Sequence, residues 1–150
     1  MSNTRARNAR MDVFRETCKS RGYRLTPQRM EVFREIDESD DHPSADIIFE
    51  RVRNRIPSIS LDTVYRILYW LEEVGLVGRV QIAGDRLRFD GNSADHHHFV
   101  CSECGAIRDF ASAEVDEVRL PDEVQSWGRI DVRHLQIRGV CLDCLGDTDD

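Results

Sequence analysis

Two C-x-x-C pairs in the last third of the chain constrain the fold more than any other feature. They are C-S-E-C at 101–104 and C-L-D-C at 141–144, separated by 36 residues. Each pair places two thiolates on one tight turn, and two such turns brought together give the tetrahedral sulfur cage that Zn²⁺ prefers. A closed set of four ligands leaves no open position for chemistry. The sequence therefore predicts a structural zinc site made by Cys101, Cys104, Cys141 and Cys144.

Other roles of cysteine pairs fit this sequence less well. The basic, polar N-terminus lacks the apolar stretch of a signal peptide, so disulfides are not expected. A redox C-x-x-C is typical of the start of a βαβ unit, and its duplication argues against that role. An iron–sulfur cluster stays open as the alternative to zinc, because thiolates also bind iron. The fifth cysteine, Cys18, lies on an amphipathic segment and is expected to be a small buried hydrophobe.

The acidity of the chain is concentrated in its C-terminal part. Of the net charge of −7, residues 1–90 contribute +1, with 16 basic and 15 acidic side chains, and residues 91–150 contribute −8, with 5 and 13. The total charge taken alone argues against a nucleic-acid partner. Yet the first 29 residues hold 8 basic side chains, and every cation of the chain except Lys19 is arginine, which suits bidentate phosphate contacts. The asymmetry indicates two domains with different functions.

The N-terminal part has the element order of a winged helix-turn-helix domain. Its segments with helical periodicity are 8–21, 26–36, 42–52 and 60–74. Two short strands follow, joined by a glycine turn at Gly84 and Asp85. The last three helices and the hairpin place 60–74 in the position of a recognition helix, where Tyr65 and Arg66 near its start could reach base edges and phosphates. The alternative is a half-buried tyrosine and a solvated arginine in an ordinary three-helix domain.

The C-terminal part is predicted to be a small α/β domain. Strands are expected at 99–110 and 130–140, with a helix around 112–126. A domain of about 60 residues has a thin core, for which zinc compensates. The chain as a whole is thus predicted to be α+β, with a DNA-binding domain over 1–90, a hinge near 88–94 and a metal-binding domain over 95–150.

A second metal site is indicated by the run Asp95-His96-His97-His98 before the first cysteine pair. In an extended segment His96 and His98 point to one face, and Asp109 on the neighbouring strand can return to that face. Histidine and carboxylate ligands suit Mn²⁺, Fe²⁺ or Zn²⁺. The alternative for consecutive histidines is a solvated loop.

Six motifs, in order along nearly the whole chain, resemble those of the ferric uptake regulator family. They are RLTPQR at 24–29, HPSAD at 42–46, SLDTVYR at 60–66, RFD at 88–90, DHHHFVCSECG at 95–105 and GVCLDC at 139–144. Within that family, the chain looks most like the peroxide-sensing branch. Asp90 and Asp109 stand where iron-responsive relatives more often carry glutamate, and aspartate at the latter position resembles the peroxide sensors.

The resemblance implies a cytoplasmic homodimer that binds palindromic double-stranded operator DNA through the winged-helix domain and dimerises through the C-terminal domain. It implies one structural Zn²⁺ per subunit at the four cysteines, and a regulatory Fe²⁺ or Mn²⁺. The regulatory ligands that it implies are His42, Asp90, His96, His98 and Asp109. The DNA contacts that it implies are Lys19, Arg24, Ser60, Thr63, Tyr65 and Arg66. No organic cofactor and no membrane partner are expected.

In the peroxide-sensing branch, peroxide reacts at bound Fe²⁺ and oxidises a histidine ligand, here His42 or His96; the site then loses iron and the repressor leaves DNA. Such a reaction is sacrificial, so the chain is not predicted to be an enzyme. One alternative is a regulator that responds to Fe, Mn or Zn availability without sensing peroxide; another is a metalloenzyme with oxidative chemistry. Arg133 stands where many relatives have a further metal-binding histidine, so an additional site at Asp95, His97 and Asp116 is expected to be empty or weak.

Overall fold

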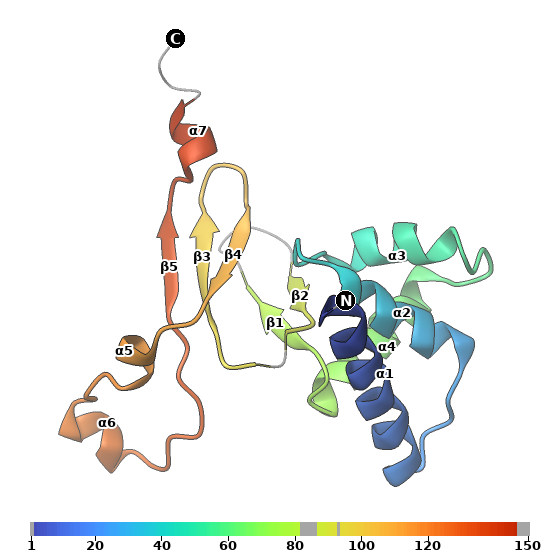
Figure 1. The fold of residues 1–150 in the computed structure, drawn as a ribbon, viewed down its shortest axis with the longest axis horizontal. Helices are drawn as coiled ribbons and strands as arrows, with labels where there is room; N and C mark the ends of the chain where they lie inside the picture. The colour runs from blue at the N-terminus through green and yellow to red at the C-terminus, as the bar shows by residue number, and fades with distance from the viewer. Residues whose placement is uncertain (1, 82–86, 93, 147–150) are drawn as a thin grey trace. The chain divides into compact units, whose positions relative to one another are not determined.

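The computed structural model describes residues 2–81, 87–92 and 94–146, and the chain divides into two compact units, residues 1–93 and 94–150 (Figure 1). The first unit is mainly helical and the second is built on a small sheet, which confirms the predicted α+β class. Across the described ranges, no helix is both long and apolar enough to cross a membrane.

The first unit is a bundle of helices closed by a two-stranded wing. Its helices are α1 (Ser2–Ser20), α2 (Pro27–Glu38), α3 (Ala45–Arg53) and α4 (Leu61–Glu73). Thr26 caps α2 by accepting a hydrogen bond from Arg29 N, with proline in the first turn, and Ser60 caps α4 by accepting from Thr63 N. Helix α1 begins earlier than predicted. Its first turns carry almost no apolar residues, so hydrophobic periodicity could not detect them.

Aromatic side chains join these helices in one core. The Phe14 and Phe33 rings stack with centroids 4.8 Å apart, and Trp70 of α4 meets Phe14 edge-on at 6.1 Å. Cys18 is 2% exposed within this core, and burial raises the pKa of its thiol. The prediction that Cys18 is a buried hydrophobe is confirmed.

The wing pairs β1 (Gly78–Val80) with β2 (Arg88–Asp90) in antiparallel register. The turn predicted at Gly84 and Asp85 lies outside the described residues. Phe89 is buried in the helical core, and its N–H donates to Pro43 O at 3.1 Å. The wing strand is therefore attached to the loop that leads into α3, which completes the winged helix-turn-helix.

The second unit is a three-stranded sheet in the order β4-β3-β5 (Figure 1). Strand β3 (His97–Cys101) pairs antiparallel with β4 (Ile107–Phe110) and parallel with β5 (Gln136–Gly139). Short helices α5 (Ala113–Asp116) and α6 (Asp122–Ser126) lie on the long excursion between β4 and β5, and α7 (Leu142–Gly146) follows β5.

Three predicted boundaries in this unit are wrong. The strand expected at 99–110 is a hairpin of two strands, and the helix expected at 112–126 is two short helices, since Pro121 disfavours helical backbone before it. Residues 130–135 alternate in polarity yet form no strand. There the Leu135 N–H donates to the His97 ring, and the Arg133 guanidinium donates to Asp116 O and Val118 O.

Gly91, directly after β2, lies too close to α2 to carry a side chain without adjustment. A Cβ there would lie 3.0 Å from Ile36 O and 3.2 Å from Ile36 C, which are backbone atoms of a helix. We predict that Gly91→Ala lowers the free energy of unfolding by about 1–3 kcal/mol, as overpacking does. Denaturant titration followed by circular dichroism measures the loss. Gly78→Ala is the control, because its Cβ would meet only Asp90 O, at 3.9 Å; equal stability losses in the two variants would contradict the prediction.

Candidate metal centres and nucleic-acid interface

The second unit brings the four cysteines of the two C-x-x-C pairs together. Cys101 Sγ lies 3.9 Å from Cys144 Sγ, and Cys104 Sγ lies 3.8 Å from Cys141 Sγ. All four sulfurs lie within 4.8 Å of one another. Four sulfurs at about 2.3 Å from one zinc ion are separated by about 3.8 Å, whereas a disulfide needs about 2.05 Å. The sulfur cage therefore fits one tetrahedral zinc ion.

The sulfur cage also favours thiolate at one position before metal enters. Backbone N–H groups of Cys104 and Cys141 donate to Cys101 Sγ and lower the pKa of that thiol to about 6. The Cys141 and Cys104 side chains raise the pKa of Cys144. Cys101 therefore becomes a thiolate more readily than an ordinary cysteine, and metal must displace a proton from Cys144.

A second ligand set in the same unit is made by His96, directly before β3, His98 on β3 and Asp109 on β4. Asp109 Oδ1 is 3.3 Å from His98 Nε2, and Asp109 Oδ2 is 3.7 Å from His96 Nε2. The two histidine rings are 4.7 Å apart, and the His96 Nδ1–H donates to Ala94 O at 2.5 Å, which leaves Nε2 as the ligand nitrogen. Ligands of one divalent ion are separated by about 3 to 3.5 Å, so this set fits part of a coordination sphere.

A third ligand set lies in the first unit, where His42 precedes α3 and Asp90 ends β2. His42 Nε2 lies 3.5 Å from Asp90 Oδ2, and both side chains are buried. The contact between Phe89 N and Pro43 O holds the two segments together. Asn92 N donates to Asp90 Oδ1 at 2.8 Å and orients the carboxylate.

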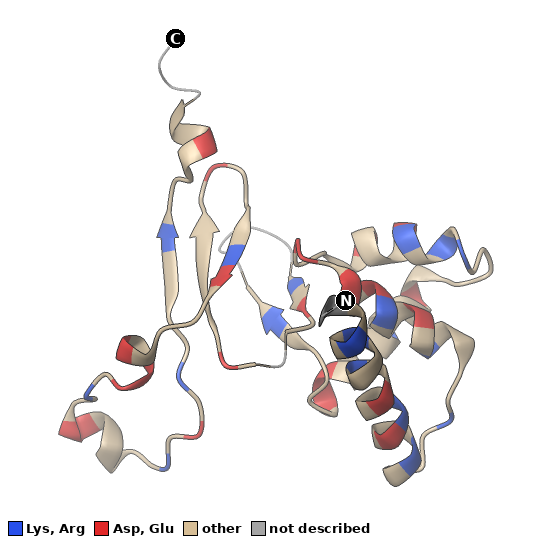
Figure 2. Ribbon diagram, in the orientation of Figure 1, with Lys and Arg blue, Asp and Glu red and all other residues tan. Residues whose placement is uncertain are grey.

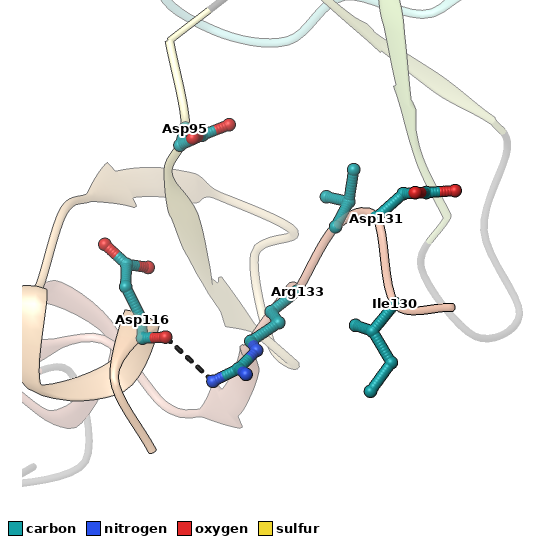
Figure 3. Close-up of a pocket in the computed structure, with 6 residues that line it drawn as sticks. Asp95, Asp116, Ile130, Asp131 and Arg133 are labelled. Carbon is teal, nitrogen blue, oxygen red and sulfur yellow. Dashed lines mark hydrogen bonds between the residues drawn. The ribbon is translucent and has the colours of Figure 1, made fainter. Parts of the chain in front are cut away.

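The middle histidine of the run has a different role. His97 is 1% exposed, its Nε2–H donates to Asp116 Oδ1 at 2.8 Å, and its Nδ1 accepts from Leu135 N at 3.1 Å. Both ring nitrogens are therefore used within the protein. Nearby, a cavity of about 250 Å³ is lined by carboxylates and by Arg133, whose guanidinium donates to Asp116 O (Figure 3). The Arg133 guanidinium thus lies beside Asp116, at the additional metal site that was expected to be empty or weak.

The predicted DNA-contacting residues lie mostly at the start of α4. Ser60 and Thr63 form its cap, with their hydroxyls 2.8 Å apart. Tyr65 is half-buried and stacks with Tyr69 at 6.1 Å, and Arg66 is exposed and pairs with Asp62 at 3.0 Å. Lys19 is exposed in the last turn of α1, and Arg24 is exposed in the loop before α2.

Arg29 was not assigned a role from the sequence, although it ends the RLTPQR motif. Its guanidinium lies over the rings of Trp70 at 4.8 Å and Tyr23 at 5.7 Å, and donates to Arg24 O at 2.6 Å. Together with Thr63 and Arg66 it lines a hollow of about 340 Å³ between the starts of α2 and α4. Helix α1 carries five basic and two acidic side chains, whereas the charged side chains of α5 and α6 are all acidic (Figure 2).

The sequence profile of the Ferric uptake regulator family matches residues 20–136. The peroxide-responsive repressor PerR of Staphylococcus epidermidis is 36% identical over 131 residues, which cover 85% of each chain.

Solved structures share the fold. The ferric uptake regulator Fur of Helicobacter pylori, described with three functional metal-binding sites, has a TM-score of 0.78 at 24% identity over 93% of both chains. The peroxide stress regulator of Campylobacter jejuni has a TM-score of 0.69 at 29% identity, over 79% of this chain and 89% of that one. A zinc uptake regulator in complex with zinc and DNA has a TM-score of 0.65 at 25% identity, over 94% of this chain and 96% of that one.

We predict that Cys101→Ser releases zinc and unfolds or dissociates the second unit, because three sulfurs no longer close the cage and the core there is thin. Zinc content by plasma emission spectroscopy and mass by sedimentation measure the two effects. Cys18→Ser is the matched control: it removes a buried thiol from the first unit and should keep full zinc. A zinc-free Cys101→Ser protein with unchanged mass and melting temperature would show that the sulfur cage is dispensable.

Proposed function

This chain belongs to the ferric uptake regulator family, and on that premise we propose that it is a metal-dependent transcriptional repressor that senses peroxide. As a cytoplasmic homodimer it binds palindromic operator DNA while its regulatory site holds Fe²⁺ or Mn²⁺. The observation that carries the proposal is a pair of histidine–aspartate ligand sets, one in each unit, beside a separate sulfur cage for zinc.

We infer that one regulatory ion is bound by both sets, through His42 and Asp90 of the first unit and His96, His98 and Asp109 of the second. Mixed nitrogen and oxygen ligands suit Fe²⁺ and Mn²⁺, whereas the sulfur cage selects zinc. An ion that binds both sets favours the arrangement of the units in which all five ligands reach it. That arrangement is the DNA-binding form.

Peroxide sensing follows from the identity of the ligands. Fe²⁺ held by these ligands would cleave the O–O bond of hydrogen peroxide: one oxygen atom would be inserted into a ring C–H bond of His42 or His96, and the other would leave as water. An oxidised imidazole is a poorer ligand, so the two units lose their shared ion and the dimer leaves DNA. Because the histidine is consumed, the protein performs one event per molecule and is not an enzyme. The 36% identity to a peroxide-responsive repressor supports this branch.

The DNA-binding step is assigned to the first unit. Helix α4 carries Thr63, Tyr65 and Arg66 near its start, the position from which a recognition helix reads the major groove. The hollow lined by Arg29 and Arg66 is suited to a backbone phosphate, which arginine binds bidentately. A family neighbour at 25% identity is described in complex with DNA, which supports the same use here.

Dimerisation is assigned to the second unit because its sheet is poorly covered. Three of the four residues of β5 are exposed, on both faces of the strand, and β5 lies at the edge of the sheet (Figure 1). Ile137 on this strand is 43% exposed, and Trp127 and Val132 are 72% and 62% exposed. A second copy of this unit would bury these apolar side chains.

The alternative function is a sensor of Fe, Mn or Zn availability. The same ligands support it, because Mn²⁺ bound to them would not react with peroxide. Exposing the Fe²⁺-loaded dimer to hydrogen peroxide separates the two functions. We predict a gain of one oxygen atom in the peptide with His42 or His96, by mass spectrometry, and loss of DNA binding by fluorescence anisotropy.

The Mn²⁺-loaded dimer is the first control and should stay unmodified and bound. His96→Ala is the second: without peroxide it should lose metal-dependent DNA binding and keep its zinc. Unmodified histidines and full DNA binding after peroxide treatment of the Fe²⁺ form would rule out peroxide sensing. Full metal-dependent binding by His96→Ala would rule out the assigned regulatory site.

We predict that Ile137→Glu dissociates the dimer. Burying a carboxylate without a partner costs more free energy than the contacts of one edge strand contribute to the interface. Sedimentation equilibrium measures the mass, and zinc content shows whether the unit still folds. Val13→Glu on α1, 55% exposed, is the control and should remain dimeric. An intact Ile137→Glu dimer would place the interface elsewhere.

A further inference from the structure

The loop between α2 and α3, residues 39–44, holds His42 in a backbone conformation that depends on its surroundings. Its φ is +48°, in the left-handed region, where the Cβ atom of an ordinary residue is crowded. His42 is the one non-glycine residue with positive φ in the described ranges. Such a conformation persists when neighbouring contacts determine it.

Arg51, in the last turn of α3, binds the loop through its guanidinium. Its Nη2 donates to Asp41 Oδ2 at 2.6 Å and its Nη1 donates to Asp41 Oδ1 at 3.3 Å. The same Nη1 lies 3.2 Å from Ser39 Oγ and 3.5 Å from Glu35 Oε1 of α2. A planar guanidinium that binds both oxygens fixes the orientation of a carboxylate as well as its position.

The residues on both sides of His42 are thus attached to different elements. Asp41, before it, is held by Arg51 of α3. Pro43, after it, accepts a hydrogen bond from Phe89 N, and Ser44 forms a bridge with Arg88. Both of these contacts are to β2, the strand that ends in Asp90. His42 Nε2 is placed beside Asp90 because the loop is fixed at both points.

We propose that Arg51 is a positioning residue for the regulatory metal: through Asp41 it holds the His42 backbone in the conformation that presents Nε2 beside Asp90. This inference rests on the proposed role of His42 as a metal ligand. Without Arg51, Asp41 is released and His42 relaxes toward the more favourable extended backbone. Metal must then reorder the loop when it binds, and its affinity falls.

Arg55 is a matched control within the same cluster of charges. Its Nε donates to Glu31 Oε2 at 2.6 Å and its Nη2 donates to Glu35 Oε2 at 2.8 Å. It therefore links α2 to the end of α3 as Arg51 does. In the part of the chain that the structure describes, its ion pairs go to α2 and not to residues 39–44.

The test measures Mn²⁺ binding to the full-length, zinc-loaded protein from the electron paramagnetic resonance signal of free Mn²⁺. We expect Arg51→Gln and Asp41→Asn each to weaken binding about tenfold, as loss of a group that orients a ligand does. The double variant should bind no more weakly than either single one, because both changes remove the same ion pair. Asp41→Glu keeps a carboxylate and should therefore retain most of the Mn²⁺ affinity that Asp41→Asn loses. Arg55→Gln should bind Mn²⁺ within about twofold of wild type, whatever its effect on melting temperature.

Four results would overturn the inference. Normal Mn²⁺ affinity in Arg51→Gln would show that the ion pair does not position the ligand. Equal losses in Arg51→Gln and Arg55→Gln, or losses that add in the double variant, would show a general effect of helix packing. Suppose that wild type binds Mn²⁺, that His96→Ala no longer binds Mn²⁺ and that Arg51→Gln binds Mn²⁺ normally. Then the proposed role of Arg51 is wrong, and the proposed function stands. If wild-type protein takes up no Mn²⁺ beyond its zinc, the proposed function fails together with the inference.

Discussion

The sulfur cage is the constraint on which the second unit depends. Strands β3 and β5 are parallel and joined through a long excursion, so their pairing costs loop-closure entropy that a few backbone hydrogen bonds repay poorly. The sulfur cage joins the turn after β3 to the residues that follow β5, and Ser102 N donates to Gly139 O at 2.8 Å beside it. Because His98 and Asp109 face each other across β3 and β4, the geometry of the proposed regulatory ligands also depends on this hairpin.

The pleat of the chain entering β3 separates three consecutive histidines into two roles. His96 and His98 approach Asp109, whereas His97 is buried against Asp116 and the backbone of Leu135. His97 contacts Asp116 and Leu135, at the two ends of the segment between α5 and β5, and Arg133 donates from within that segment to Asp116 O and Val118 O. These contacts hold an excursion that has little regular structure. One face of the strand therefore carries the proposed ligands, and the other makes contacts that fix the fold around them.

The sequence predicted the parts of the sites that depend on local geometry. The spacing of the cysteines was enough to predict that the four sulfurs come together. The alternation of side chains along an extended chain was enough to predict that His96 and His98 approach Asp109. His42 and Asp90 could not be paired in this way, because their proximity depends on how the loop before α3 packs on the wing strand. For the same reason Arg51 carried no signal: its role depends on a bidentate contact with a loop ten residues earlier. Alternating polarity misled at 130–135, where the Leu135 N–H donates to the His97 ring and no strand forms.

The unequal division of the regulatory ligands has a consequence for the proposed switch. The first unit offers two ligands and the second offers three, so each set alone binds a divalent ion more weakly than all five together. That difference in affinity supplies the free energy that favours one arrangement of the units. Tighter binding to one set alone would not favour either arrangement, because that set is present in both. Oxidation of His42 would leave the first unit with Asp90 alone, and the link between the units would be lost while the sulfur cage remained intact. The loop that holds His42 is therefore as much a part of the switch as the ligands, because an ion that has to order this loop first gives up part of the same free energy.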